Sequence, residues 1–119
     1  MELNCMETPT GLTIELAGNM DVAGCAEIRP KLDVILEIES GGEQVVLDLN
    51  RVTYLDSSGV GVIVYLFKRL KENNSSLEII NAHNQPLEFI QLLRIDTAIG
   101  VNDVKTTSDV VYELAQEAN

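Results

Sequence analysis

The feature that most constrains the fold is the regular alternation of strand-like and helix-like segments along the chain. Residues 12–17 alternate apolar and polar side chains, which is the period of a strand with one buried face. Residues 45–49 form a nearly continuous apolar run, which is typical of a central strand in a parallel sheet. Longer segments with helical spacing of apolar residues follow these strands. The alternation therefore predicts an α/β fold with a largely parallel sheet.

The expected elements follow the order β-β-α-β-α-β-α-β-α within a single domain, residues 1–119. The sheet is mixed and largely parallel, with about five strands and about four helices. The expected strands are residues 3–6, 12–17, 45–49, 77–80 and 98–101, the first two forming a hairpin. The expected helices are a first one carrying Cys25, Ile28, Leu32, Ile35 and Leu36, then residues 57–72, 86–93 and 108–115. Breaks are expected at residues 18–21 and 50–56.

Two helices need a further prediction each. Pro30 lies inside the first helical stripe, where proline removes a hydrogen bond and clashes one turn back. Either the helix begins near Arg29 with the proline in its first turn, or it is kinked, so we expect a broken or kinked helix. The apolar face expected for the helix at residues 57–72 consists of Val60, Ile63, Val64, Phe67 and Leu70.

The charge balance excludes several classes of partner. Nineteen acidic and eight basic residues give a net charge of −11. Such a domain repels phosphate backbones and anionic lipid surfaces, so we expect no nucleic acid partner. No stretch reaches the roughly 20 apolar residues that span a bilayer, and residues 1–6 lack the apolar core of a signal peptide. We therefore expect a cytoplasmic protein with no membrane insertion.

The residues that usually bind metals or catalyse reactions are sparse. Cys5 and Cys25 are better explained as two reduced small apolar residues than as a disulfide, and His83 as a surface loop residue. The chain has no CxxC motif, no Gly-Lys-Ser/Thr phosphate loop and no third glycine after Gly59 and Gly61. We therefore expect no metal, no cofactor and no enzymatic activity. A nucleotide-handling enzyme is a weaker alternative, because it would need that lysine or paired metal carboxylates.

One segment carries recognisable chemistry, where a buried strand leads into a helix. Either Asp56 or Ser57 can cap that helix; if Ser57 does, Ser58 takes the first helical position with its hydroxyl facing solvent. Gly59 and Gly61 remove side chains, so the backbone of a partner can come close. A phosphate on Ser58 would lie at the positive end of the helix dipole. The same residues also suit a plain helix cap with tight helix–strand packing.

This segment, Leu-Asp-Ser-Ser-Gly-Val-Gly-Val-Ile at residues 55–63, resembles the signature of the STAS domain of bacterial anti-sigma factor antagonists. The likeness extends to Leu-Ala-Gly-Asn-Met-Asp at residues 16–21 and Val-Val-Leu-Asp-Leu at residues 45–49, and covers nearly the whole chain. It implies phosphorylation of Ser58 by an anti-sigma factor serine/threonine kinase, and dephosphorylation by a metal-dependent serine phosphatase. The unphosphorylated form would bind the kinase, and the phosphorylated form would release it.

The resemblance also indicates a partner surface, although one part of the chain departs from the family. The expected partner-binding residues are Asp21, Asp56, Ser57, Ser58, Gly59, Val60 and Gly61. Asp21 is better explained as the cap of the first helix. Many relatives carry Thr or Ser a few residues after that aspartate, whereas this chain has Val-Ala-Gly-Cys at residues 22–25. An alternative function is a permanently bound structural STAS subunit of a larger assembly, either a stress-sensing complex or a lipid transporter.

Overall fold

The five strands of the computed structural model form one mixed sheet, and the structure describes residues 1–102. The elements are β1 (Glu2–Thr8), β2 (Gly11–Met20), α1 (Val22–Ile38), β3 (Gln44–Leu55), α2 (Ser57–Glu72), β4 (Ser76–Ile80), α3 (Asn84–Leu92), a short 3₁₀ helix (Ile95–Thr97) and β5 (Gly100–Asn102). The helix expected at residues 108–115 lies outside the described residues. The predicted α/β class with a mostly parallel sheet is confirmed.

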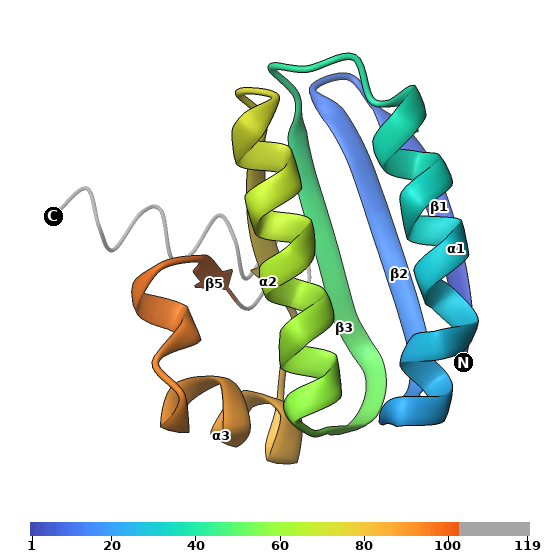
Figure 1. Ribbon diagram of the computed structural model, residues 1–119. Helices are drawn as coiled ribbons and strands as arrows, with labels where there is room; N and C mark the ends of the chain where they lie inside the picture. The colour runs from blue at the N-terminus through green and yellow to red at the C-terminus, as the bar shows by residue number, and fades with distance from the viewer. Residues whose placement is uncertain (103–119) are drawn as a thin grey trace, which may run out of the picture.

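The sheet order follows the chain order, β1-β2-β3-β4-β5. β1 and β2 form the predicted antiparallel hairpin, and β2, β3, β4 and β5 are parallel to one another. Helices α1 and α2 lie side by side over one face of the sheet, and both begin at the end where β2 and β3 finish (Figure 1). The starts of the two helices are therefore brought to one edge of the molecule.

The core lies between the sheet and these two helices. β2 and β3 are paired so that Ile14 lies opposite Leu47, and both side chains are fully buried. The other large side chains that are almost completely buried are Leu16, Met20, Ile28, Leu32, Leu49, Leu55, Ile63, Leu66, Leu70 and Ile79. Removal of this apolar surface from water stabilises the layered arrangement and fixes the positions of the helices.

The face of α2 that packs on the sheet differs from the one expected. Its buried residues are Gly59, Val62, Ile63, Leu66 and Leu70. Of the predicted stripe, Ile63 and Leu70 are buried, while Val60 and Phe67 are half-buried and pack against the core. Val64 is half-buried, and the prediction missed Gly59, Val62 and Leu66. Gly59 was missed because it has no side chain to mark it as apolar, although it lies directly on the sheet.

Strands β2 and β3 are longer than their apolar patterns indicate. They continue to Met20 and Leu55, so the breaks expected at residues 18–21 and 50–56 were wrong for all but their last residues. Pairing of Gly18 with Val52, and of Met20 with Leu55, holds these polar segments in the sheet. β4 pairs with β3 only up to Asp48. The ends of β2 and β3 therefore project past β4, and we call this two-stranded part the β2–β3 extension.

Helix α1 runs through Pro30 as a single helix, so both a start near Arg29 and a broken helix are wrong. Pro30 is exposed, and so is Ala26, whose carbonyl loses its helical partner and can bond to water. The opposite face carries Ile28 and Leu32, which are buried against the sheet. Burial of that face outweighs the cost of the proline, because tertiary packing supplies most of the stability of a helix in a protein.

The remaining helix and strand predictions within residues 1–102 hold with small shifts. α3 begins at Asn84 and not at Pro86, and β5 begins at Gly100 and not at residue 98. Both cysteines are free: Cys25 is buried and Cys5 is exposed. His83 is exposed, as expected for a surface residue.

The far ends of α1 and α2 are joined by a buried carboxylate. Glu39, which caps the end of α1, is only 6% exposed. It accepts hydrogen bonds from the Ser75 hydroxyl, the Asn73 amide at 3.0 Å and the Gly41 backbone N–H at 2.9 Å. Burial on its own would raise the pKa of Glu39, but these three hydrogen bonds outweigh it and the pKa lies below its ordinary value.

Protonation of Glu39 is expected to destabilise the fold in acid. Because its pKa is lower in the folded chain than in the unfolded one, its stabilising effect is present above about pH 4.3 and is lost as pH falls through the folded pKa. Urea unfolding from pH 7 to pH 3 should show a smaller loss of stability on acidification in Glu39→Gln than in the wild type. Glu37→Gln, an exposed position on the same helix, is the control. Identical slopes in all three proteins would contradict this account.

A second prediction concerns the close contact between α1 and β2. A Cβ atom at Gly24 would overlap the backbone oxygen of Asn19, whereas one at Gly61 would meet no atom within 4 Å. Gly24→Ala should lower the free energy of unfolding by about 1–3 kcal/mol through overpacking. Gly61→Ala should raise it by about 0.5–1 kcal/mol, since alanine favours the helix. Urea unfolding of both variants checks the two signs, and a Gly24→Ala protein as stable as wild type would refute the steric explanation.

Candidate functional site

The start of α2 is fixed by Asp56, the residue that directly follows β3. Asp56 is the N-cap, and its Oδ1 accepts hydrogen bonds from the backbone N–H groups of Ser58 at 2.8 Å and Gly59 at 3.4 Å. Its own N–H donates to Met20 O on β2 at 3.3 Å. One carboxylate therefore joins the helix start to the end of the sheet, and the alternative cap, Ser57, is wrong.

The two serines occupy the first and second positions of α2. Because Asp56 is the cap, Ser58 lies at the second helical position and not at the first, where a cap at Ser57 would have placed it. Ser57 is exposed and Ser58 is half-buried. Among residues 1–102, neither the Ser58 hydroxyl nor the Ser57 backbone N–H has a hydrogen-bond partner. The Ser58 hydroxyl is therefore unengaged at the positive end of a helix, where a phosphate is electrostatically favoured.

Gly59 and Gly61 differ in exposure, since the first faces the sheet and the second faces solvent. Gly59 is buried, and a Cβ atom there would overlap Leu55 and lie 2.8 Å from the Met20 Cβ. Gly61 is exposed, with no atom within 4 Å of its Cβ direction, and Val60 between them is half-buried. Gly59 therefore allows α2 to pack closely on the sheet. Of the two glycines, only Gly61 is open at the surface, and its contact with a partner stays a prediction.

Helix α1 begins with the same arrangement as α2. Asp21 caps it, as predicted, by accepting a hydrogen bond from the backbone N–H of Gly24 at 2.8 Å. In both helices the capping aspartate is followed three residues later by a glycine that lies close to the end of a strand. Because Met20 and Leu55 are paired in the sheet, the two capped helix starts are neighbours. Repetition of Asp-x-x-Gly after two strands is a sequence signal that the pattern analysis missed.

The thiol of Cys25 lies close enough to both capping aspartates for their charges to affect its pKa. Burial raises the pKa of the Cys25 thiol, and the carboxylates of Asp56 and Asp21 raise it further. A buried thiol beside two carboxylates is held in its neutral form and is a poor nucleophile. The edge formed by the starts of α1 and α2 is thus acidic, which bears directly on what happens when phosphate is added there.

Sequence analysis also missed a contact from α3. The side chain of Gln85, in the first turn of α3, accepts a hydrogen bond from Leu55 N–H at 2.8 Å. It also donates to the Leu55 carbonyl oxygen at 2.7 Å. Leu55 is the last residue of β3 and immediately precedes Asp56. No sequence pattern predicts this long-range contact, because a single glutamine in a helix has many possible partners.

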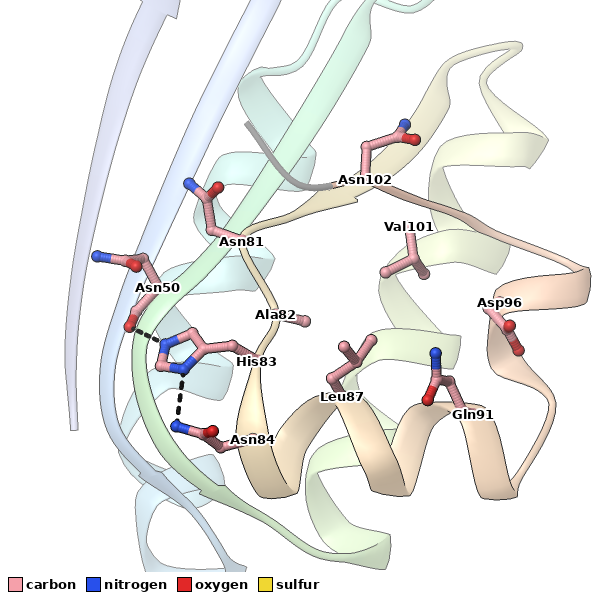
Figure 2. Close-up of a pocket in the computed structure, with 10 residues that line it drawn as sticks. All are labelled: Asn50, Asn81, Ala82, His83, Asn84, Leu87, Gln91, Asp96, Val101 and Asn102. Atoms are coloured by element: carbon pink, nitrogen blue, oxygen red, sulfur yellow. Dashed lines mark hydrogen bonds between the residues drawn. The ribbon is translucent and has the colours of Figure 1, made fainter. Parts of the chain in front are cut away.

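A separate cavity of about 730 Å³ lies beyond the carboxyl ends of β4 and β5 (Figure 2). Its polar lining includes Asn50, Asn81, Asn84, Asn102 and His83. The His83 Nε2 donates to the Asn50 carbonyl oxygen at 2.8 Å, and its Nδ1 lies 3.1 Å from the Asn84 amide nitrogen. The cavity lining contains no nucleophile paired with a base. Within residues 1–102, no group of three His, Cys, Asp or Glu residues is placed to hold a metal ion.

Comparison with known proteins places the chain in a family. Residues 5–104 match the family model described as "Mlab, STAS domain". The chain belongs to the STAS domain family, which confirms the resemblance seen at residues 55–63. In the part of the chain that the structure describes, no helix is long and apolar enough to cross a membrane.

Named relatives agree with this assignment. The anti-sigma-B factor antagonist of Listeria monocytogenes is 30% identical over 96 residues, covering 79% of this chain and 81% of the relative. The anti-sigma-B factor antagonist of Bacillus subtilis is 27% identical over 104 residues, covering 87% of each. The structure of the Bacillus cell fate determinant SpoIIAA in its phosphorylated form has a TM-score of 0.67 at 18% identity, covering 95% of this chain and 99% of that chain.

The cap at Asp56 is expected to be a measurable source of stability. Asp56→Ala removes the acceptor for two backbone N–H groups and should lower the free energy of unfolding by about 0.5–2 kcal/mol. Asp56→Asn keeps an acceptor oxygen of the same reach, so its stability should stay close to that of the wild type. Urea unfolding at pH 7 compares the three proteins. If Asp56→Asn loses as much stability as Asp56→Ala, the carboxylate acts through its charge and not as a cap.

Proposed function

We propose that this chain is a cytoplasmic, non-enzymatic anti-sigma factor antagonist that is switched by phosphorylation of Ser58. In its unphosphorylated form it binds an anti-sigma factor serine/threonine kinase, and phosphorylation by that kinase releases it. A metal-dependent serine phosphatase restores the binding form. The observation that carries the proposal is the unengaged Ser58 hydroxyl at a capped helix start, in a chain whose relatives are anti-sigma-B factor antagonists.

The proposed binding surface is the edge at the starts of α1 and α2. Ser57 and Gly61 expose backbone and small side chains there, which allows a partner to approach closely. Val22, the first residue of α1, is 72% exposed and adds an apolar contact. Asp21 and Asp56 are partly buried and add negative charge. A partner with a basic rim would be attracted to this edge by the chain's net charge of −11.

Phosphorylation acts on this surface through charge. A phosphate on Ser58 adds about −1.5 to −2 charges at neutral pH. Asp56 already accepts from the Ser58 and Gly59 N–H groups, so the phosphate is added beside a carboxylate and does not replace it. The helix dipole tolerates the dianion while the site faces water. Burying the dianion against a partner with no matching cation costs several kcal/mol, so the complex dissociates without a large change of shape.

A charge substitution at Ser58 is expected to reproduce release. Ser58→Asp should weaken binding to the kinase by about 100- to 1000-fold, which corresponds to about 3–4 kcal/mol. Ser58→Asn has the same shape without the charge, so it should keep affinity within about tenfold of the wild type. A pull-down from the source bacterium with wild type and Ser58→Asp, analysed by mass spectrometry, identifies the kinase. Calorimetric titration of the purified kinase then measures the three affinities.

A phosphorylation assay with the same kinase identifies the modified residue. Incorporation of phosphate should be lost in Ser58→Ala and retained in Ser57→Ala, because only the second serine matches the family's modified position. Equal capture of one large complex by wild type and Ser58→Asp would contradict the switch. That result would favour a permanently bound structural subunit of a stress-sensing complex or transporter.

A further inference from the structure

The β2–β3 extension has an open side. β3 pairs with β4 only as far as Asp48 and Ile80, whereas β3 itself continues to Leu55. On its other side, β2 pairs with β3 along the whole extension, ending at Met20 and Leu55. The edge of β3 that faces away from β2 therefore lacks a neighbouring strand just where the chain approaches Asp56. Backbone N–H and C=O groups on such an edge need other partners.

Gln85 supplies those partners at the end of β3. Its side-chain carboxamide accepts from Leu55 N–H at 2.8 Å and donates to Leu55 O at 2.7 Å. These are the two bonds that a residue of an adjacent antiparallel strand would exchange with Leu55. The Leu55 side chain is fully buried, so the backbone beneath this contact has little access to water. One side chain from α3 thus takes the place of the missing strand.

The contact acts on the peptide plane that leads into the cap. The Leu55 carbonyl and the Asp56 N–H belong to the same planar peptide group. Gln85 holds the carbonyl side of this plane, and Met20 O on β2 accepts from the Asp56 N–H at 3.3 Å. The plane is therefore fixed from both sides. Its orientation determines where the Asp56 side chain lies, and Asp56 in turn holds the N–H groups of Ser58 and Gly59.

We propose that Gln85 is a positioning residue for the Ser58 site, a role that rests on the proposed function of that serine. By fixing the Leu55–Asp56 peptide, Gln85 keeps the capped first turn of α2 in the conformation that the kinase binds. The start of α3 has a second attachment to β3, since His83 Nε2 donates to Asn50 O at 2.8 Å (Figure 2). Loss of the Gln85 side chain should therefore release the peptide plane without detaching α3.

The test compares Gln85→Ala and Gln85→Glu with Gln91→Ala. Gln85→Glu is nearly isosteric, but its carboxylate cannot donate to Leu55 O at neutral pH, so it should fail to restore the contact. Gln91 lies on the same helix and is exposed, with no side-chain hydrogen bond among the described residues, so it serves as the matched control. Amide hydrogen exchange by NMR is measured on the purified chain, together with urea unfolding.

Both Gln85 variants should speed amide exchange at Ser58 and Gly59 by about five- to tenfold, the equivalent of one lost hydrogen bond. Exchange at Leu55 should rise in Gln85→Ala alone, because the carboxylate of Gln85→Glu can still accept from Leu55 N–H. Exchange at the core amides of Ile14 and Leu47 should change only as much as global stability does. Affinity for the purified kinase should fall by about the same factor of five to ten. Gln91→Ala should match the wild type in all of these measurements.

Two results would overturn the role of Gln85. One is unchanged exchange at Ser58 and Gly59 in both Gln85 variants; the other is a uniform rise at every amide that follows global stability. Neither result depends on the kinase. Failure of the proposed function is seen separately, as equal kinase binding by wild type and Ser58→Asp, and in that case the exchange data alone decide whether Gln85 positions the first turn of α2.

Discussion

The hydrogen bonds of the Asp56 carboxylate are the interaction on which the geometry around Ser58 depends. Asp56 stands between the last residue of β3 and the first turn of α2, and it binds the backbone of both Ser58 and Gly59. Close packing at Gly59 brings the helix onto the sheet, and the Leu55–Asp56 peptide is held by Met20 and Gln85. The position of the Ser58 hydroxyl therefore follows from backbone contacts and a rigid core, with no hydrogen bond of its own among the described residues.

Use of a carboxylate as the cap has an electrostatic consequence. Aspartate at the start of α1 and of α2 complements the helix dipole in the unphosphorylated chain, and Asp21 repeats at α1 what Asp56 does at α2. A phosphate that arrives at Ser58 then joins an edge that already carries two carboxylates. The edge tolerates the added charge while it faces water and becomes unsuitable for burial against a protein. The stability of the domain therefore depends on the capping hydrogen bonds of this edge, whereas its affinity for a partner depends on the charge at Ser58.

Much of this arrangement could be predicted from the sequence, and the failures have physical causes. The bounds of α2, the hairpin and the parallel order followed from periodicity, because buried faces must be apolar. The ends of β2 and β3 were missed because Gly18, Asn19 and Asn50 are typical of turns, whereas pairing between the two strands keeps them extended. Gly59 was missing from the expected buried face of α2 because it carries no apolar side chain. The contact of Gln85 with Leu55 depends on tertiary structure alone, which no local pattern encodes.

The most direct test of a switch that works through charge at a preformed site is to incorporate phosphoserine at position 58 genetically and record the ¹H–¹⁵N spectrum of the chain. The account predicts shift changes confined to the first turns of α1 and α2 and the adjoining ends of β2 and β3. It also predicts that amide exchange in the core stays as slow as in the unmodified chain. Changes spread through the sheet, or loss of protection at the Gly59 amide, would show that phosphorylation rebuilds the site, and would contradict the account.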